Sequence, residues 1–188
     1  PAEAIASRIG MIHQHFMLVP TLTVAENVAL GTQSTRRPFT DLDVVSRRVS
    51  EISEKHGLAV DPSVEVRRLA VGERQRVEII KALYRDAELL VLDEPTAVLV
   101  PQEVTELFEN LRELVDKGLT VLFISHKLDE VLSIADDITI MRQGTTVATK
   151  KPAETNKKEL AELMVGGELP KPIAGVLNIS EKSILSIK

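Results

Sequence analysis

The chain has 188 residues, of which 44% are hydrophobic and 27% are charged, and its formal net charge is −5. This is the composition of a globular protein with a core, and the acidic balance and 3% aromatic content argue against a general nucleic-acid binder. Because cysteine is absent, disulfides and thiolate metal sites are excluded.

The first part of the chain predicts a short strand followed by a short helix. Residues 9–14 have the sequence IGMIHQ, which is typical of a short strand that begins just after a helix end. Thr23 and Glu26 have the spacing of a capping box, in which the hydroxyl accepts from the third helical amide and the carboxylate accepts from the cap. Gly31 is expected to end that helix.

Two longer helices are predicted next. Residues 41–56 carry apolar side chains on one helical face, and Gly57 provides a stop signal. A further helix begins near Gly72. We therefore expect residues 20–85 to form a helical subdomain beside a sheet.

Two continuous apolar runs predict parallel strands. Leu89 to Leu92 form the first run, and residues 119–125, with the sequence LTVLFIS, form the second. Such runs are typical of strands buried on both faces by helices. An amphipathic helix beginning at Pro101 lies between them, so the fold class is predicted to be α/β with a parallel core sheet.

The last part of the chain predicts a hairpin and one more helix. Residues 138–150 alternate in polarity around Gly144, which indicates two antiparallel strands joined by a tight turn. Asn156 and Glu159 have capping-box spacing before a helix at about 156–165.

Polar side chains follow three of the predicted strands. Gln14 follows the first strand, Asp93 and Glu94 end the second, and His126 follows the third. Ligands of open α/β sheets bind at the carboxyl ends of the strands, so these residues are expected to share one site. Two adjacent carboxylates at the end of an apolar strand are costly unless a cation or hydrogen-bond donors face them.

A second candidate binding element lies before the helix near Gly72. The free amides at the beginning of a helix bind phosphate, and glycine lets the backbone approach an anion closely. The segment LAVGERQ, from Leu69 to Gln75, therefore indicates a possible phosphate contact.

Together these motifs resemble the ATP-binding cassette of ABC transporters. The segment IGMIHQHFMLVP resembles the Q-loop, LAVGERQ the signature loop, LLVLDEP the Walker B strand, TAVLVPQE the D-loop and VLFISHKLDEV the switch-histidine region. Five motifs in the family's order make the resemblance specific. The sequence from His13 to Gly31 is similar to that of ATPases serving simple-sugar and nucleoside importers.

The resemblance implies ATP and Mg²⁺ as cofactors and assigns a role to each residue of the strand ends. Asp93 would hold Mg²⁺, and Gln14 would reach both the metal and the attacking water. Glu94 would orient that water or act as its general base. His126 would contact the γ-phosphate side and help to hold the water.

The signature segment would act on a nucleotide bound by a second cassette. Its expected binding residues are Leu69, Ala70, Val71, Gly72 and Glu73. Ala70 stands where the family usually has serine, so one hydroxyl donor is missing, and Val100 departs from the usual D-loop residue. Both changes make the signature half of the site an open question.

The sequence contains no P-loop. Such a loop needs Gly followed by Lys and then Ser or Thr, and none of the nine glycines is followed by lysine. We therefore expect a partial P-loop NTPase fold that lacks the N-terminal β-rich part, in a chain that begins at Pro1 in the middle of a domain. Alone, this chain is predicted to bind ATP weakly and to be inactive.

The predicted domain organisation follows the resemblance. Residues 1–168 would be a partial cassette, with the helical subdomain at about 20–85, the remaining catalytic core at about 86–150 and a C-terminal helix at about 156–165. Residues 169–188 would be a linker, with the start of a second cassette as the further reading.

The function predicted first is that of an ATP-hydrolysing subunit of a sugar or nucleoside importer. It would lie peripherally on the cytoplasmic face of the membrane and bind permease subunits and a second cassette, serve a solute-binding protein indirectly, and bind no nucleic acid. This fits the absence of an apolar run of about 18 residues and of a signal-peptide pattern. The alternatives are a soluble non-transport ATPase of the same superfamily and a non-catalytic fragment.

Overall fold

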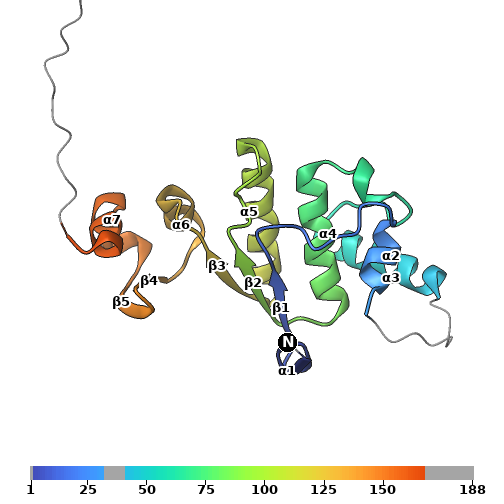
Figure 1. Cartoon of the computed structure of the whole chain (residues 1–188), viewed down its shortest axis with the longest axis horizontal. Helices are drawn as coiled ribbons and strands as arrows, with labels where there is room; N and C mark the ends of the chain where they lie inside the picture. Colours follow the sequence, from blue (N-terminus) through green and yellow to red (C-terminus); the bar gives the residue numbers. More distant parts are fainter. Residues whose placement is uncertain (1, 32–40, 168–188) are drawn as a thin grey trace, which may run out of the picture. The chain divides into compact units, whose positions relative to one another are not determined.

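The computed structural model describes residues 2–31 and 41–167 (Figure 1). The chain divides into two compact units, Pro1–Asp136 and Asp137–Lys188. This division falls inside the predicted core segment 86–150. The predicted linker at 169–188 lies outside the described residues. No helix in the described ranges is long and apolar enough to cross a lipid bilayer.

The first unit contains a parallel sheet of three strands. They are β1 (Ile9–Ile12), β2 (Leu89–Asp93) and β3 (Thr120–Ile124), in the order β1-β2-β3 (Figure 1). Ile9 pairs with Leu89, and Leu89 pairs with Thr120. The predicted α/β class with a parallel core is confirmed.

Helices fill the long connection between β1 and β2. After α1 (Ala2–Ala6) and β1, the chain forms α2 (Val24–Ala29), α3 (Leu42–His56), a 3₁₀ turn η1 (Val66–Arg68) and α4 (Val71–Tyr84). Helices α2, α3 and α4 pack against one another. Both hydrogen bonds of the predicted capping box at Thr23 and Glu26 are present, and Gly57 ends α3 in the left-handed conformation.

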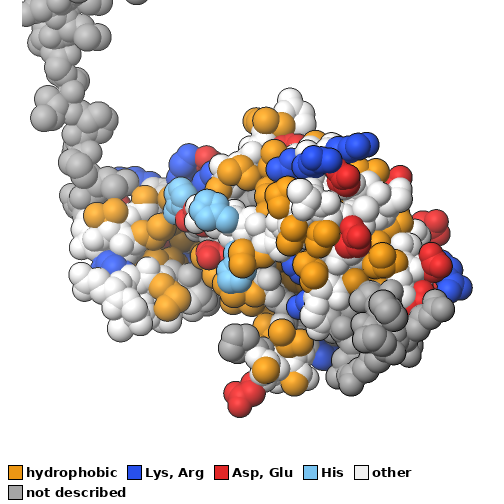
Figure 2. Space-filling model, turned by 45° about the vertical axis from the view of Figure 1, so that its right-hand side comes forward, with side chains coloured by type: hydrophobic (Ala, Val, Ile, Leu, Met, Phe, Trp, Pro, Cys, Tyr) orange, Lys and Arg blue, Asp and Glu red, His pale blue; other side chains and the backbone are white. Residues whose placement is uncertain are grey.

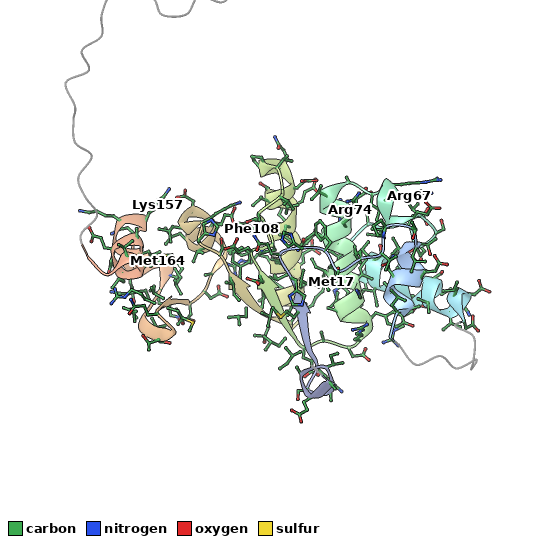
Figure 3. All side chains as sticks on the ribbon, in the orientation of Figure 1. Met17, Arg67, Arg74, Phe108, Lys157 and Met164 are labelled. Atoms are coloured by element: carbon green, nitrogen blue, oxygen red, sulfur yellow. The ribbon has the colours of Figure 1, made fainter. Side chains whose placement is uncertain are left out.

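One face of the sheet carries the core of the unit. Helix α4 packs on β1, and α5 (Pro101–Asp116) packs on β3. Gly10 permits the approach of α4, because a Cβ at this position would lie 2.9 Å from the Cβ of Ala82. Phe108, labelled in Figure 3, meets Phe123 edge to face with ring centroids 5.7 Å apart. Leu90 and Leu92 on this face are fully buried.

The opposite face of the sheet is open among the described residues. Met11, Leu122 and Ile124 are 49%, 52% and 44% exposed. The expectation that both apolar runs are buried on two faces is therefore wrong for the described chain. The reason is that α4 and α5 cover the same face, on which Gly10 and Phe123 lie.

Helix α6 (Leu128–Ile134) follows β3 and closes the first unit. The second unit contains the antiparallel strands β4 (Ile138–Arg142) and β5 (Thr145–Lys150), the 3₁₀ turn η2 (Pro152–Glu154) and α7 (Lys157–Val165), which packs on β4. The predicted hairpin is confirmed.

The predicted capping box of α7 is only half formed. The side chain of Asn156 accepts from the amide of Glu159 at 3.0 Å. The carboxylate of Glu159 turns instead to Lys150, at 2.8 Å, and to the hydroxyl of Thr155. These two contacts lower the pKa of Glu159, with the hydrogen bond from Lys150 as the larger cause. A nearby lysine on β5 has therefore replaced the backbone amide as the partner of this carboxylate.

Candidate functional site

The carboxyl ends of the three parallel strands bring the predicted site residues to one edge of the sheet. Gln14 lies just past β1, Asp93 is the last residue of β2, Glu94 follows it, and His126 lies just past β3. Since the strands are parallel and in register, their ends lie side by side.

Glu94 is the centre of this group. One of its carboxylate oxygens lies 2.8 Å from Nδ1 of His126, and the other accepts from Nε2 of Gln14 at 3.3 Å. The three side chains come from three separate strand ends, so only the sheet brings them together. Gln14, Glu94 and His126, which we call the strand-end cluster, therefore form a hydrogen-bonded group as the sequence indicated.

The backbone of Glu94 adopts an unusual conformation. Its φ of +46° lies in the left-handed region, which costs a non-glycine residue of the order of 1–3 kcal/mol. Its amide donates to the carbonyl of Ile124 at 2.9 Å, and its carbonyl accepts from the amide of Ala97 at 3.2 Å. Such a conformation persists only where the surrounding structure holds it, and it often marks a functional position.

The strand-end cluster is accessible to solvent. The side chains of His126 and Glu94 are 65% and 30% exposed, and Figure 2 shows histidine side chains at the surface. A water molecule or an anion could therefore reach Glu94 directly.

The oxygen donors at this edge suit a magnesium ion that also binds phosphate. The described residues contain no group of three or more His, Asp or Glu able to hold a metal ion by themselves. The carboxylate of Asp93 makes no hydrogen bond or ion pair within the described ranges, and Gln14, which has an amide oxygen of its own, donates to the adjacent residue Glu94. Magnesium typically takes one or two protein oxygens and completes its shell with water and phosphate, so these residues fit it.

The signature segment leads into α4. Leu69 is buried in the core, so only its backbone can face a ligand. Ala70 is the N-cap of the helix and has no hydroxyl with which to accept from its first turn. The carboxylate of Glu73 accepts from the amide of Ala70 at 2.7 Å, which leaves half of a capping box.

The amide of Gly72, which was expected to face phosphate, already has an anionic partner. Glu103 of α5 accepts from this amide at 3.0 Å with one oxygen and from the amide of Val100 at 3.1 Å with the other. Sequence reasoning missed this residue. Its position three residues after Val100 was the available signal, because it matches the acidic half of a capping box.

Two further residues missed from the sequence hold the loop after Gln14. The amide of Met17, labelled in Figure 3, donates to the carboxylate of Glu78 at 2.8 Å, and the ammonium of Lys81 donates to the carbonyl of Met17 at 2.9 Å. Glu78 and Lys81 both belong to α4, so the Q-loop segment and the signature helix are directly connected.

A cavity of about 450 Å³ lies away from this site, toward the amino ends of β2 and β3. Arg48, His56 and Leu119 are among the residues that line it. Burial, together with the charges of Lys117 and Lys55, lowers the pKa of His56. None of the predicted site residues lines this cavity.

Comparison with protein families gives a match to the ABC transporter family over residues 1–97. Among curated proteins, a glucose import ATP-binding protein of Haloferax volcanii is 44% identical over 90% of the chain, and a nucleoside import ATP-binding protein of Lactococcus lactis is 46% identical over 88%. The chain spans 36% and 33% of the length of these relatives.

Solved structures give the same picture. A protein of Clostridium perfringens that is part of an ABC transporter complex is 27% identical, with a TM-score of 0.67 over 85% of this chain and 62% of its own. A nucleotide-free ATP-binding cassette from an ABC transporter is 26% identical, with a TM-score of 0.69 over 88% of this chain and 68% of its own.

Proposed function

Because the chain belongs to the ABC transporter family, we propose that it is part of an ATP-hydrolysing subunit that drives import of a simple sugar or a nucleoside. The observation that carries this proposal is the strand-end cluster, in which Glu94 lies within hydrogen-bonding distance of both Gln14 and His126. Three polar side chains from separate strand ends are suited to hold a water molecule for attack on a phosphate.

Asp93 and Gln14 are the residues that would hold Mg²⁺. The bound ion supplies charge neutralisation at the β- and γ-phosphate oxygens. The carboxylate of Asp93 makes no hydrogen bond or ion pair in the described ranges that would have to break first. Gln14 can contribute its side-chain oxygen while its amide nitrogen remains on Glu94.

We assign Glu94 the role of orienting the water and accepting its proton. An ionised carboxylate only accepts hydrogen bonds, so the nitrogen of His126 that faces Glu94, Nδ1, is the donor, and Nε2 is directed elsewhere. In the tautomer with the proton on Nδ1, Nε2 is an acceptor, and it is suited to accept from the water molecule rather than to contact a phosphate oxygen. The amide of Gln14 occupies the other carboxylate oxygen, and this limits the directions from which a water can approach.

We assign the backbone of Leu69 to Glu73 to a nucleotide bound by a second cassette. Gly72 can donate to a phosphate only after Glu103 releases its amide, so assembly of two cassettes is coupled to movement between α4 and α5. The partial cassette would span residues 1–168, and residues 169–188 would link it to the next domain.

The membrane partner is proposed to be a permease, contacted on its cytoplasmic face by the loop after Gln14 and the neighbouring helices. The contacts of Glu78 and Lys81 with the backbone of Met17 support this assignment. They connect the loop that begins at the strand-end cluster to the signature helix, so a change at Glu94 can reach both surfaces. A solute-binding protein would act indirectly, through the permease.

Co-purification tests this function in the source cell. With an affinity tag on the protein, a detergent extract is expected to yield a membrane protein with several spans and an associated ATPase activity. Recovery only with ribosomes or DNA would overturn the transport proposal in favour of a non-transport ATPase.

The 188-residue chain alone is predicted to bind ATP with a dissociation constant above about 1 mM, because it lacks the glycine and lysine pair of a P-loop. Isothermal titration with MgATP measures this directly. Micromolar affinity would contradict the prediction.

A further inference from the structure

Lys127 directly follows His126 and reaches across to the loop after Glu94. Its ammonium donates to the carbonyl of Thr96 at 2.9 Å and lies 3.3 Å from the hydroxyl of the same residue. Thr96 is two residues beyond Glu94. A side chain next to the histidine therefore holds the backbone next to the glutamate.

Glu130 of α6 completes this arrangement. Its carboxylate accepts from the hydroxyl of Thr96 at 2.6 Å and lies 3.2 Å from the ammonium of Lys127. Thr96 is only 1% exposed, and the side chain of Glu130 is 14% exposed. Thr96 and Glu130 satisfy each other in a largely buried place, whereas the side chain of Lys127 is 40% exposed. Removing the hydroxyl or the carboxylate leaves its partner with an unmet hydrogen bond, and removing Lys127 frees the carbonyl of Thr96.

The contacts converge on the segment whose backbone is strained. The left-handed conformation of Glu94 needs support from its surroundings, and the turn that follows contains the bond from Ala97 to the Glu94 carbonyl. Thr96 lies inside that turn. The hydroxyl and carbonyl of Thr96 fix the turn to the segment that carries His126.

We propose that Lys127, Thr96 and Glu130 are positioning residues that hold the carboxylate of Glu94 against the ring of His126. Their consequence for hydrolysis rests on the proposed function, whereas their effect on the geometry does not. Without them, the turn after Glu94 relaxes and the contact between Glu94 and His126 opens.

The tautomer of His126 reports this geometry in the 188-residue chain without any nucleotide. Nuclear magnetic resonance of ¹⁵N-histidine-labelled protein at alkaline pH, where imidazole is neutral, distinguishes a proton on Nδ1 from one on Nε2. The chain has four histidines, and the spectrum of His126→Gln assigns the resonance. Glu94→Ala gives the tautomer ratio of an unpaired ring.

The wild type is expected to favour the Nδ1 proton more than Glu94→Ala does. Lys127→Met and Thr96→Val are each expected to shift the tautomer ratio of His126 toward that of Glu94→Ala by at least about twofold. This corresponds to the lower end of the interaction energies found between residues of one hydrogen-bond network. Thr96→Ser, which keeps the hydroxyl, is expected to keep the wild-type tautomer ratio. Lys117→Met is the matched control, because Lys117 also donates to a backbone carbonyl, that of Lys55 at 2.8 Å.

An unchanged ratio in folded Lys127→Met overturns the positioning role alone. If that variant does not fold, Lys127→Ala, which also has no donor for the carbonyl of Thr96, takes its place, and an unchanged ratio there has the same meaning. If Lys117→Met changes the tautomer ratio of His126 as much as Lys127→Met does, the proposal is also overturned, because the change would be a general effect of removing a lysine. A wild-type ratio equal to that of Glu94→Ala overturns the pairing itself, on which the proposed function also depends.

Discussion

The strand-end cluster and the beginning of α4 differ in how far the chain satisfies its own polar groups. At the strand ends, the carboxylate of Asp93 makes no hydrogen bond or ion pair within the described ranges, and the ring of His126 is largely exposed. At the helix, Gly72 and Ala70 donate to carboxylates of the same chain, Glu103 and Glu73. The first region is ready for a ligand, whereas the second must give up an internal contact to receive one.

This difference has a simple electrostatic cause. A helix start has several free amides and partial positive charge, so an acidic residue nearby stabilises it. At the strand end, Glu94 has partners in Gln14 and His126, but the carboxylate of Asp93 has none within the described ranges and is suited to an external cation. A phosphate arriving at Gly72 therefore competes with Glu103, whereas a cation arriving at Asp93 competes only with water.

The largest expected effect comes from the strand ends. Glu94→Gln removes the carboxylate that contacts both Gln14 and His126, so ATP hydrolysis by the detergent-purified complex, with the substitution in the whole ATPase subunit, is expected to fall at least about 100-fold. A phosphate-release assay measures this, with Glu106→Gln as the control. An unreduced rate of ATP hydrolysis would show that the strand-end cluster is not the catalytic region.

The next effect concerns the internal contact of the second region. Glu103→Ala takes the acceptor away from the amides of Gly72 and Val100, so the free energy of unfolding is expected to fall by about 1–2 kcal/mol. Urea unfolding followed by circular dichroism checks it. Glu106→Ala, which removes an exposed carboxylate of the same helix, should change it by less than about 0.5 kcal/mol. Equal losses in the two variants would mean that Glu103 is not a specific cap.

A stabilising substitution sharpens the same contrast. Ala70 already has the extended conformation of an N-cap, so Ala70→Ser adds an acceptor for the amide of Glu73 without moving the backbone. Stability is expected to rise by about 0.5–1 kcal/mol. The midpoint of urea unfolding measures it, and Ala70→Gly serves as a comparison without a hydroxyl. A decrease would contradict the assignment of Ala70 as the cap.

The smallest effect lies outside both regions, at His56. Its pKa is lowered in the fold, chiefly by burial, so the unfolded chain binds the proton more strongly. The neutral ring therefore contributes stability above its ordinary pKa of 6.5, and this contribution is lost as pH falls toward the lowered folded value. His56→Gln should reduce the slope of urea midpoint against pH below 6.5. An unchanged slope would assign the dependence to other groups.

Much of the local structure was predictable because it depends on short-range chemistry. The capping box at Thr23 and Glu26, the glycine stop at Gly57 and the turn at Gly144 depend on residues close together in the chain. The same holds for the strands that Gln14, Glu94 and His126 follow, so the meeting of these side chains at one sheet edge followed from the parallel order. The half-formed cap at Asn156 failed for the opposite reason, since Lys150 competes for Glu159 across the fold.

By itself, the sequence determined which segments are helices and strands, and which polar residues stand at the ends of the strands. Hydrophobic period and cap chemistry are local, so no partner was needed to predict them. Only the tertiary structure decided that Glu103 occupies the amide of Gly72, and that Lys127, Thr96 and Glu130 join the two loops around Glu94. These contacts depend on the positions of α5 and α6 against distant segments, and burial of apolar side chains sets those positions without encoding the polar partners.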